Sequence, residues 1–281
     1  MGDYRKMTVV LVGAGGKMGC RITDNLRSSE YEMRFVETGL IGLEQLAARS
    51  LRAVPQNDAV KGADMVILAV PDVAIKQVSQ EIVPLMNSGA MLILLDPAAA
   101  YIGQLPERGD IGYFVAHPCH PPIFNDETEP EAKRDFFGGV AAKQAVVCTL
   151  VQGSEEDYGR AEELAKRMYA PVMRSHRVTL EQMAMLEPAM AETIGAAAAL
   201  MLRAAMDEAI RSGVPEEAAK DFMLGHLNIL LAVAFGIAGN PMSDACLIAA
   251  EYGEKRLFQE GWQRLFEPED VRKQINLMLH P

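Results

Sequence analysis

The chain has 281 residues, 49% of them hydrophobic and 23% charged, which is typical of a globular enzyme with one large domain or two smaller ones. A formal net charge of −11 at pH 7 argues against nucleic acid or an anionic membrane as the main partner. The four cysteines are scattered without zinc-type pairs, and we find no signal peptide and no apolar run of about 20 residues. We therefore expect a cytoplasmic protein that does not span a membrane.

A glycine-rich turn organises the amino-terminal half. The apolar run from Val9 to Val12 stops at GAGGKMG, and a segment with helical pattern follows. Strand, glycine turn and helix in this order are typical of dinucleotide-binding units, because backbone amides at the helix start can approach a pyrophosphate closely. A tight turn without a ligand is the alternative interpretation.

An acidic residue, Glu37, ends the next apolar strand. It lies near the interval of about 20 residues after the glycines at which a carboxylate binds the adenosine ribose, which favours NAD over NADP. The alternative is a solvated charge at a strand end. The predicted cofactor contacts are Gly13, Ala14, Gly15, Gly16, Lys17, Met18, Gly19, Glu37, Pro71 and Asp72.

Further apolar strands alternate with helical segments along the next part of the chain. This alternation predicts an α/β fold, with a Rossmann domain whose sheet is doubly wound and mostly parallel. Ligands on such sheets bind at the carboxyl ends of the strands, where Pro71-Asp72, Asp96-Pro97 and His117-Pro118 stand. The strands are expected at 61–70, 91–95, 111–116, 145–151 and 171–178.

From Thr179 onward the pattern is helical only. We predict an NAD-binding Rossmann domain over 1–176 and an all-α substrate and dimerisation domain over 177–281. Thr179 and Gln182 form a capping-box pattern, and Pro188 is expected to kink the helix that follows. Prolines 215, 241 and 268 are expected at the starts of three further helices. The many Ala, Met and Leu side chains of these helices present more apolar surface than the helices can cover by themselves, so we expect a homodimer.

Two histidines stand on a proline-rich stretch, FVAHPCHPPIFND. A strand delivers His117 to the carboxyl edge of the sheet, and His120 follows on the same loop. Beside a nicotinamide, a histidine can take the proton of an alcohol or bind a metal ion. Alternatively, His117 ends a strand and His120 is merely exposed.

Carboxylates on the proline-containing helix are the second candidate group. Glu187 precedes Pro188 within the apolar stretch MAMLEPAMAE, where a carboxylate is unusual unless it is paired or bound to a metal. Glu192 lies five residues later and is either a site residue or a solvated charge. His226, in the next helix, is another possible site residue, although a lone histidine in an apolar helix is more often a core residue with its hydrogen bonds satisfied.

These features resemble the phosphogluconate dehydrogenase-like superfamily. The resemblance rests on GAGGKMG, on AVPD after the third strand, on Asp96, on His117-Pro118 and on the helical carboxyl-terminal half. The AHP element is similar to that of prephenate dehydrogenases, and the glutamate-bearing helices are similar to those of ketol-acid reductoisomerase, where carboxylates hold divalent metal. The stretch AHPCHPP resembles most closely the D-apionate oxidoisomerase family.

This last resemblance implies an NAD-dependent oxidation of a branched sugar acid, D-apionate, followed by a metal-assisted 1,2-shift to 3-oxo-isoapionate. It implies His117 and Glu187 as ligands of a zinc-like or magnesium-like divalent ion, with His120 or Glu192 as the base. Two other functions stay open. One is a hydroxy-acid or prephenate-type dehydrogenase without metal, and the other is a non-catalytic NAD-binding protein.

Overall fold

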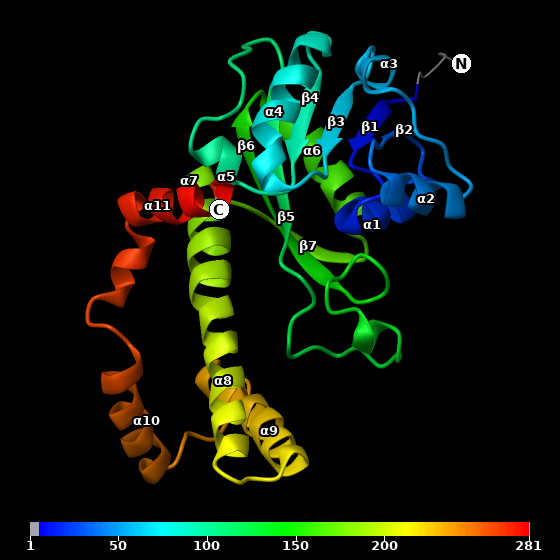
Figure 1. Ribbon diagram of the computed structural model, residues 1–281. Coiled ribbons are helices and arrows are strands. Elements are labelled where there is room, and N and C mark those ends of the chain that lie inside the picture. Colours follow the sequence, from blue (N-terminus) through cyan, green and yellow to red (C-terminus); the bar gives the residue numbers. More distant parts are fainter. Residues whose placement is uncertain (1–5, 281) are drawn as a thin grey trace. The chain divides into compact units, whose positions relative to one another are not determined.

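The computed structural model describes residues 6–280, which form two compact units (Figure 1). The first unit comprises residues 6–187 and 272–280, and the second comprises Pro188–Val271. The division into an NAD-binding domain over 1–176 and a helical domain over 177–281 stays a prediction.

A seven-stranded sheet forms the centre of the first unit, in the order β2-β1-β3-β4-β5-β6-β7 (Figure 1). All neighbouring strands are parallel except β5 and β6, which are antiparallel. This confirms the predicted mostly parallel sheet. The strands are β1 (Thr8–Val12), β2 (Glu32–Val36), β3 (Met65–Leu68), β4 (Met91–Leu94), β5 (Gly112–Pro118), β6 (Gln144–Gln152) and β7 (Val172–Arg177).

Helices cover both faces of this sheet, because the central strands are apolar on both sides. In β1, Val9 and Leu11 pack with side chains of α1 and α6, whereas Val10 and Val12 pack with side chains of α3 and α4. The α/β, doubly wound architecture is therefore confirmed. The helices of this layer are α1 (Lys17–Leu26), α2 (Leu40–Ala48), α3 (Gln56–Val60), α4 (Asp72–Ile82), α5 (Ala98–Tyr101), α6 (Glu155–Met168) and α7 (Leu180–Ala184).

The reversal of direction at β6 follows from its connection to β5. Parallel neighbours need a crossover that is usually a helix, but 119–143 contains only the short 3₁₀ turn Ala132–Arg134. This segment returns the chain beside β5 in the opposite direction.

The helix that carries the glutamates begins as predicted. The Thr179 hydroxyl accepts the Gln182 N–H, and the Gln182 side chain accepts the Thr179 N–H, so the capping box is confirmed. Pro188 lies within a π-helical stretch, Met185–Ala196. A proline has no N–H to give to an α-helical ladder, and the π register accommodates this loss.

Three helices make up most of the second unit: α8 (Ala197–Arg211), α9 (Glu216–Ala234) and α10 (Asp244–Leu257). The last helix of the chain, α11 (Pro268–Leu279), begins at its predicted proline. The predicted start at Pro241 is wrong, because the Ser243 hydroxyl caps the helix by accepting the Cys246 N–H. A hydroxyl cap sets the helix start more strongly than a proline two residues earlier.

The helices of the second unit bury few of their own side chains. No residue of α8 or α10 is buried, and in α9 only Ala219 and Ala232 are. Within residues 6–280, the helical run Leu180–Arg211 has the length and apolar composition of a membrane span, with a mean hydropathy of 1.3 and 6% of its window buried. One such run is weak evidence for a span, because core helices of soluble proteins share these properties.

Candidate active site

The glycine turn after β1 is packed too closely for side chains. Gly13 has a φ of +79°, and a Cβ there would lie 2.4 Å from the carbonyl oxygen of Ala69. A Cβ at Gly19 would lie 1.9 Å from the carbonyl oxygen of Gly13. The turn therefore brings α1 tightly against the end of β1, and α1 begins at Lys17. The N–H groups of its first turn have no partners within the helix and suit an anion such as a pyrophosphate.

Glu37 is fixed against this turn. One carboxylate oxygen accepts the Gly15 N–H at 2.9 Å, and the other accepts the N–H groups of Thr38 and Gly39, each at 2.9 Å. Gly42 of α2 makes this placement possible, because a Cβ there would lie 2.4 Å from the Glu37 Cδ. The sequence interpretation missed Gly42, and its only signal was a glycine inside a helical pattern.

Pro71 and Asp72 follow β3 beside the same turn. Val70 Cγ1 lies 3.2 Å from the position of a Cβ at Gly13, so the end of β3 borders the turn. Pro71 is the N-cap residue of α4, and Asp72 is its first residue. A carboxylate at this position interacts favourably with the positive end of the helix dipole.

Three side chains at the carboxyl edge of the sheet form a cluster that can hold a metal ion. Asp96, His117 and Glu187 each offer one ligand atom, and these atoms all lie within 4.8 Å of one another. Asp96 follows β4, His117 lies in β5, and Glu187 lies on the helix after α7. Both carboxylates are buried, with exposed fractions of 7% for Asp96 and 8% for Glu187. The sequence interpretation placed Asp96 at the sheet edge but did not include it in the cluster.

The backbone orients two members of this cluster. His117 Nδ1 lies 2.8 Å from the carbonyl oxygen of Leu95, which can only accept, so Nδ1 carries the proton and Nε2 keeps a lone pair. Histidine ligands of metals commonly donate their other N–H in this way. The Ala98 N–H donates to Asp96 at 2.6 Å. Burial lowers the pKa of His117, and the Asp96 carboxylate partly opposes this, so the imidazole is neutral at neutral pH.

The second histidine of the stretch lies next to the first. The rings of His117 and His120 are 6.1 Å apart between centroids and nearly perpendicular. His120 Nδ1 lies 2.9 Å from the Phe137 carbonyl oxygen, so Nδ1 donates to this oxygen and Nε2 is the nitrogen on the opposite side of the ring, without a role in this hydrogen bond. His120 holds a φ of 60°, which is uncommon outside glycine and reflects the tight turn after β5.

Two other sequence candidates belong to the second unit. The Glu192 side chain is exposed on the π-helical stretch. His226 is exposed as well, contrary to the expectation of a core histidine. Its ring stacks on Phe222 at 3.8 Å between centroids, and its Nδ1 lies 2.8 Å from the Phe222 carbonyl oxygen. The ring is thus packed and hydrogen-bonded within its own helix.

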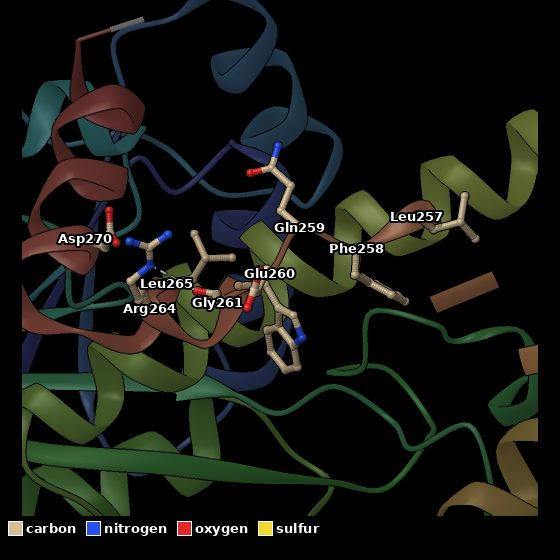
Figure 2. A pocket seen from close by; sticks show the side chains of 9 residues that line it. Leu257, Phe258, Gln259, Glu260, Gly261, Arg264, Leu265 and Asp270 are labelled. Carbon is tan, nitrogen blue, oxygen red and sulfur yellow. Dashed lines mark hydrogen bonds between the residues drawn. The ribbon is translucent and has the colours of Figure 1, made fainter. Parts of the chain in front are cut away.

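The second unit also contains a cavity of about 460 Å³ lined by residues between Leu257 and Asp270 (Figure 2). Gly261 turns the chain there with a φ of +74°, and its carbonyl oxygen accepts the Arg264 Nε–H at 3.2 Å. None of the predicted site residues lines this cavity, so the candidate site is the cluster at the sheet edge.

Comparison with known proteins identifies the family. Residues 125–279, more than half of the chain, match the family phosphogluconate dehydrogenase (decarboxylating) C-term, and residues 8–99 match NADP oxidoreductase coenzyme F420-dependent. D-apionate oxidoisomerase of Rhizobium rhizogenes is 51% identical over 96% of this chain and 98% of its own length. The enzyme of Cupriavidus necator is 48% identical over the same shares. The chain belongs to the D-apionate oxidoisomerase family.

Solved structures agree with this assignment. A crystal structure of a semialdehyde dehydrogenase NAD-binding protein from Cupriavidus necator, in complex with calcium and NAD, matches with a TM-score of 0.95 and 48% identity. That match covers 98% of this chain and 100% of the other. An NADH-preferring ketol-acid reductoisomerase from an uncultured archaeon matches with a TM-score of 0.66 at 16% identity, covering 98% of this chain and 82% of its own. This last likeness concerns the fold alone. The family and the NAD-binding dehydrogenase fold implied by the sequence are thus confirmed.

Proposed function

We propose that this chain is an NAD-dependent oxidoisomerase that converts D-apionate to 3-oxo-isoapionate with the help of a divalent metal ion. The observation that carries the proposal is the buried group of Asp96, His117 and Glu187 at the carboxyl edge of a dinucleotide-binding sheet. The full-length similarity to D-apionate oxidoisomerases supports the substrate.

The cofactor is NAD in this proposal. The pyrophosphate would lie against the first-turn N–H groups of α1, which are contributed by Lys17, Met18 and Gly19. Glu37 is held in place by backbone N–H groups, and its carboxylate is suited to accept the hydroxyls of the adenosine ribose. A carboxylate at this position repels the phosphate of NADP, which supports the choice of NAD.

The side chains present fit a divalent metal. The set comprises one imidazole nitrogen and two carboxylate groups, a combination suited to zinc and other divalent ions. Asp96, His117 and Glu187 would hold the ion. The hydrogen bond from His117 Nδ1 to the Leu95 carbonyl orients the imidazole ring and leaves Nε2 as the nitrogen that would bind the metal. When bound, a divalent ion would polarise a ketone oxygen and favour migration of a neighbouring group.

The chain's own residues have separate roles in the two steps. In the oxidation, the carbon bearing the secondary alcohol loses a hydride to NAD while a base removes the hydroxyl proton. His120 can act as this base, because its backbone hydrogen bond uses Nδ1 and leaves Nε2 for the substrate, on the ring next to His117. Glu192 is the second candidate. The resulting ketone stands beside a tertiary alcohol, and a 1,2-shift of this α-ketol gives the 3-oxo acid.

The exposed apolar side chains of the second unit support a homodimer, and the free cysteines support a location in the cytoplasm. Large apolar side chains of the second unit are exposed, among them Leu200 at 71%, Phe235 at 74% and Ile248 at 69%. A second copy would cover such a surface. The free thiols of Cys20, Cys119, Cys148 and Cys246 agree with a reducing compartment. A monomer in size-exclusion chromatography with light scattering at micromolar concentration would contradict the dimer.

The product identifies the reaction. We expect the purified protein to form NADH from D-apionate and NAD, and ¹³C NMR to show a rearranged 3-oxo acid. An unrearranged 2-oxo acid would instead identify a plain dehydrogenase. The variants His120→Asn and Glu192→Gln separate the two candidate bases, because loss of the base lowers kcat by about 10²- to 10⁴-fold.

A further inference from the structure

The segment 119–143 connects the histidines to the helix that begins at the glycine turn. Phe137 is the residue of this segment that contacts both His120 and the first residue of α1. Its carbonyl oxygen accepts a hydrogen bond from His120, and its ring centroid lies 6.1 Å from the His120 ring. The Lys17 ammonium lies over the Phe137 ring, 3.6 Å from the centroid. One residue thus contacts both the candidate base and the first residue of α1.

The position of Phe137 is determined by its own loop. The buried Asp135 carboxylate accepts three backbone N–H groups, from Val140, Ala141 and Ala142, at 2.9–3.2 Å. Gly138 follows Phe137 with a φ of +73°, and a Cβ there would lie 2.4 Å from a Gln144 side-chain oxygen. These contacts fix the backbone on both sides of Phe137, from which its ring projects toward Lys17.

Helix α1 contacts this loop along one face. Lys17, Arg21 and Asn25 are four residues apart, so they project from the same side of the helix. The Arg21 guanidinium lies 5.2 Å from the centroid of the Phe137 ring, and Asn25 donates to the Gly139 carbonyl oxygen at 3.2 Å. The loop and the cofactor-binding helix are therefore joined at several points.

Lysine is an unfavourable first residue for an isolated helix. Its charge lies at the positive end of the helix dipole, and the first turn of α1 has no acidic side chain to offset it. An aromatic ring holds an ammonium without neutralising its charge, whereas a carboxylate would cancel it. Lys17 is thus fixed in direction while its charge stays available to an anion at the helix start.

We propose that Phe137 is a positioning residue for the dinucleotide, whose ring holds the Lys17 ammonium at the amino end of α1, where the pyrophosphate binds. This inference rests on the proposed cofactor site. It adds a residue more than 100 positions from the glycine motif to the determinants of cofactor affinity. The Phe137 carbonyl independently supports His120, so the ring and the backbone of one residue serve the two halves of the site.

The test is a fluorescence titration of the full-length protein with NADH. We expect Phe137→Leu to weaken NADH binding about three- to tenfold, the effect of losing one cation–π contact, while Phe137→Tyr, which keeps the ring face, binds as the wild type. In a Lys17→Met background, Phe137→Leu should have no further effect. Phe136→Leu is the matched control, because the neighbouring Phe136 is 76% exposed, and it should bind as the wild type.

The outcomes separate this inference from the proposed function. Failure of the wild type to bind NADH would overturn the proposed function and this inference with it. Wild-type binding with an unchanged dissociation constant for Phe137→Leu would overturn the inference alone. An equal loss of affinity with and without Lys17 would do the same, because the ring would then act through another group. The His120 hydrogen bond goes to the backbone carbonyl of residue 137, so it persists in the leucine variant.

Discussion

Gly42 of α2 controls the position of the Glu37 carboxylate, so the substitution Gly42→Ala should weaken NAD binding from outside the glycine motif. The new Cβ would lie 2.4 Å from Glu37 Cδ and 2.5 Å from Oε2, whereas ordinary contacts begin at 3.4 Å. The Glu37 side chain is the flexible partner and must move. Its hydrogen bond with the Gly15 N–H, now 2.9 Å long, would be lost.

The size of the effect follows from the bonds involved. A hydrogen bond to a charged group contributes about 1.5–3 kcal/mol, so misplacing the ribose acceptor should weaken NADH binding by about ten- to a hundredfold. The free energy of unfolding should fall by no more than about 3 kcal/mol, because the lost Gly15–Glu37 hydrogen bond and the overpacking are partly offset by the better helix propensity of alanine. Fluorescence titration with NADH and urea unfolding measure the two quantities.

Gly159→Ala in α6 is the matched control. A Cβ at Gly159 meets nothing within 4 Å, so this variant should be as stable as the wild type or more stable, with unchanged NADH affinity. The reasoning would be refuted if Gly42→Ala bound NADH as tightly as Gly159→Ala. It would also be refuted if Gly42→Ala weakened binding equally in a Glu37→Gln background, because the effect would then not pass through the carboxylate.

Three further predictions concern the metal site and the buried thiol. His117→Ala, Glu187→Ala and Asp96→Asn should each lower metal affinity at least about tenfold without unfolding the protein; unchanged metal content by elemental analysis would refute the ligand set. Burial lowers the pKa of His117 below its ordinary 6.5, so the unfolded chain binds more protons than the folded one below about pH 6.5. Metal-free protein should therefore lose stability as the pH falls through this range, by at most about 1.4 kcal/mol per pH unit from this group. In urea unfolding, His117→Asn should show a smaller decline of stability with falling pH. A decline identical to that of the wild type would count against a buried neutral imidazole. Burial raises the pKa of Cys148 to about 12, so at pH 8 a thiol reagent should label Cys148 only after unfolding, and rapid labelling of the native protein would contradict its burial.

Local patterns in the sequence predicted much of the fold and pointed to part of the candidate site. The glycine turn and the strand alternation carry their own signals, because a buried parallel strand is continuously apolar and a dinucleotide turn needs glycine. The direction of β6 had no such signal, since its apolar run is the same for either direction and only the helix-poor 119–143 segment decides it.

The site depended on contacts between distant segments. His117 was predicted from its strand end, but the inclusion of Asp96 depends on where its side chain points after β4. Gly42 and Phe137 gain their roles only through packing against Glu37 and Lys17. Residue type alone does not reveal such neighbours, because an exposed phenylalanine and a helical glycine are common in any sequence.

The central claim is that one site both oxidises the sugar acid and rearranges it with a metal held by Asp96, His117 and Glu187. The most direct measurement is NADH formation from D-apionate before and after EDTA treatment, with NADH binding followed in the same samples. The account predicts that chelation abolishes formation of the rearranged product while NADH binding survives, and that added divalent metal restores turnover. Full formation of the rearranged product in the chelated protein would contradict it.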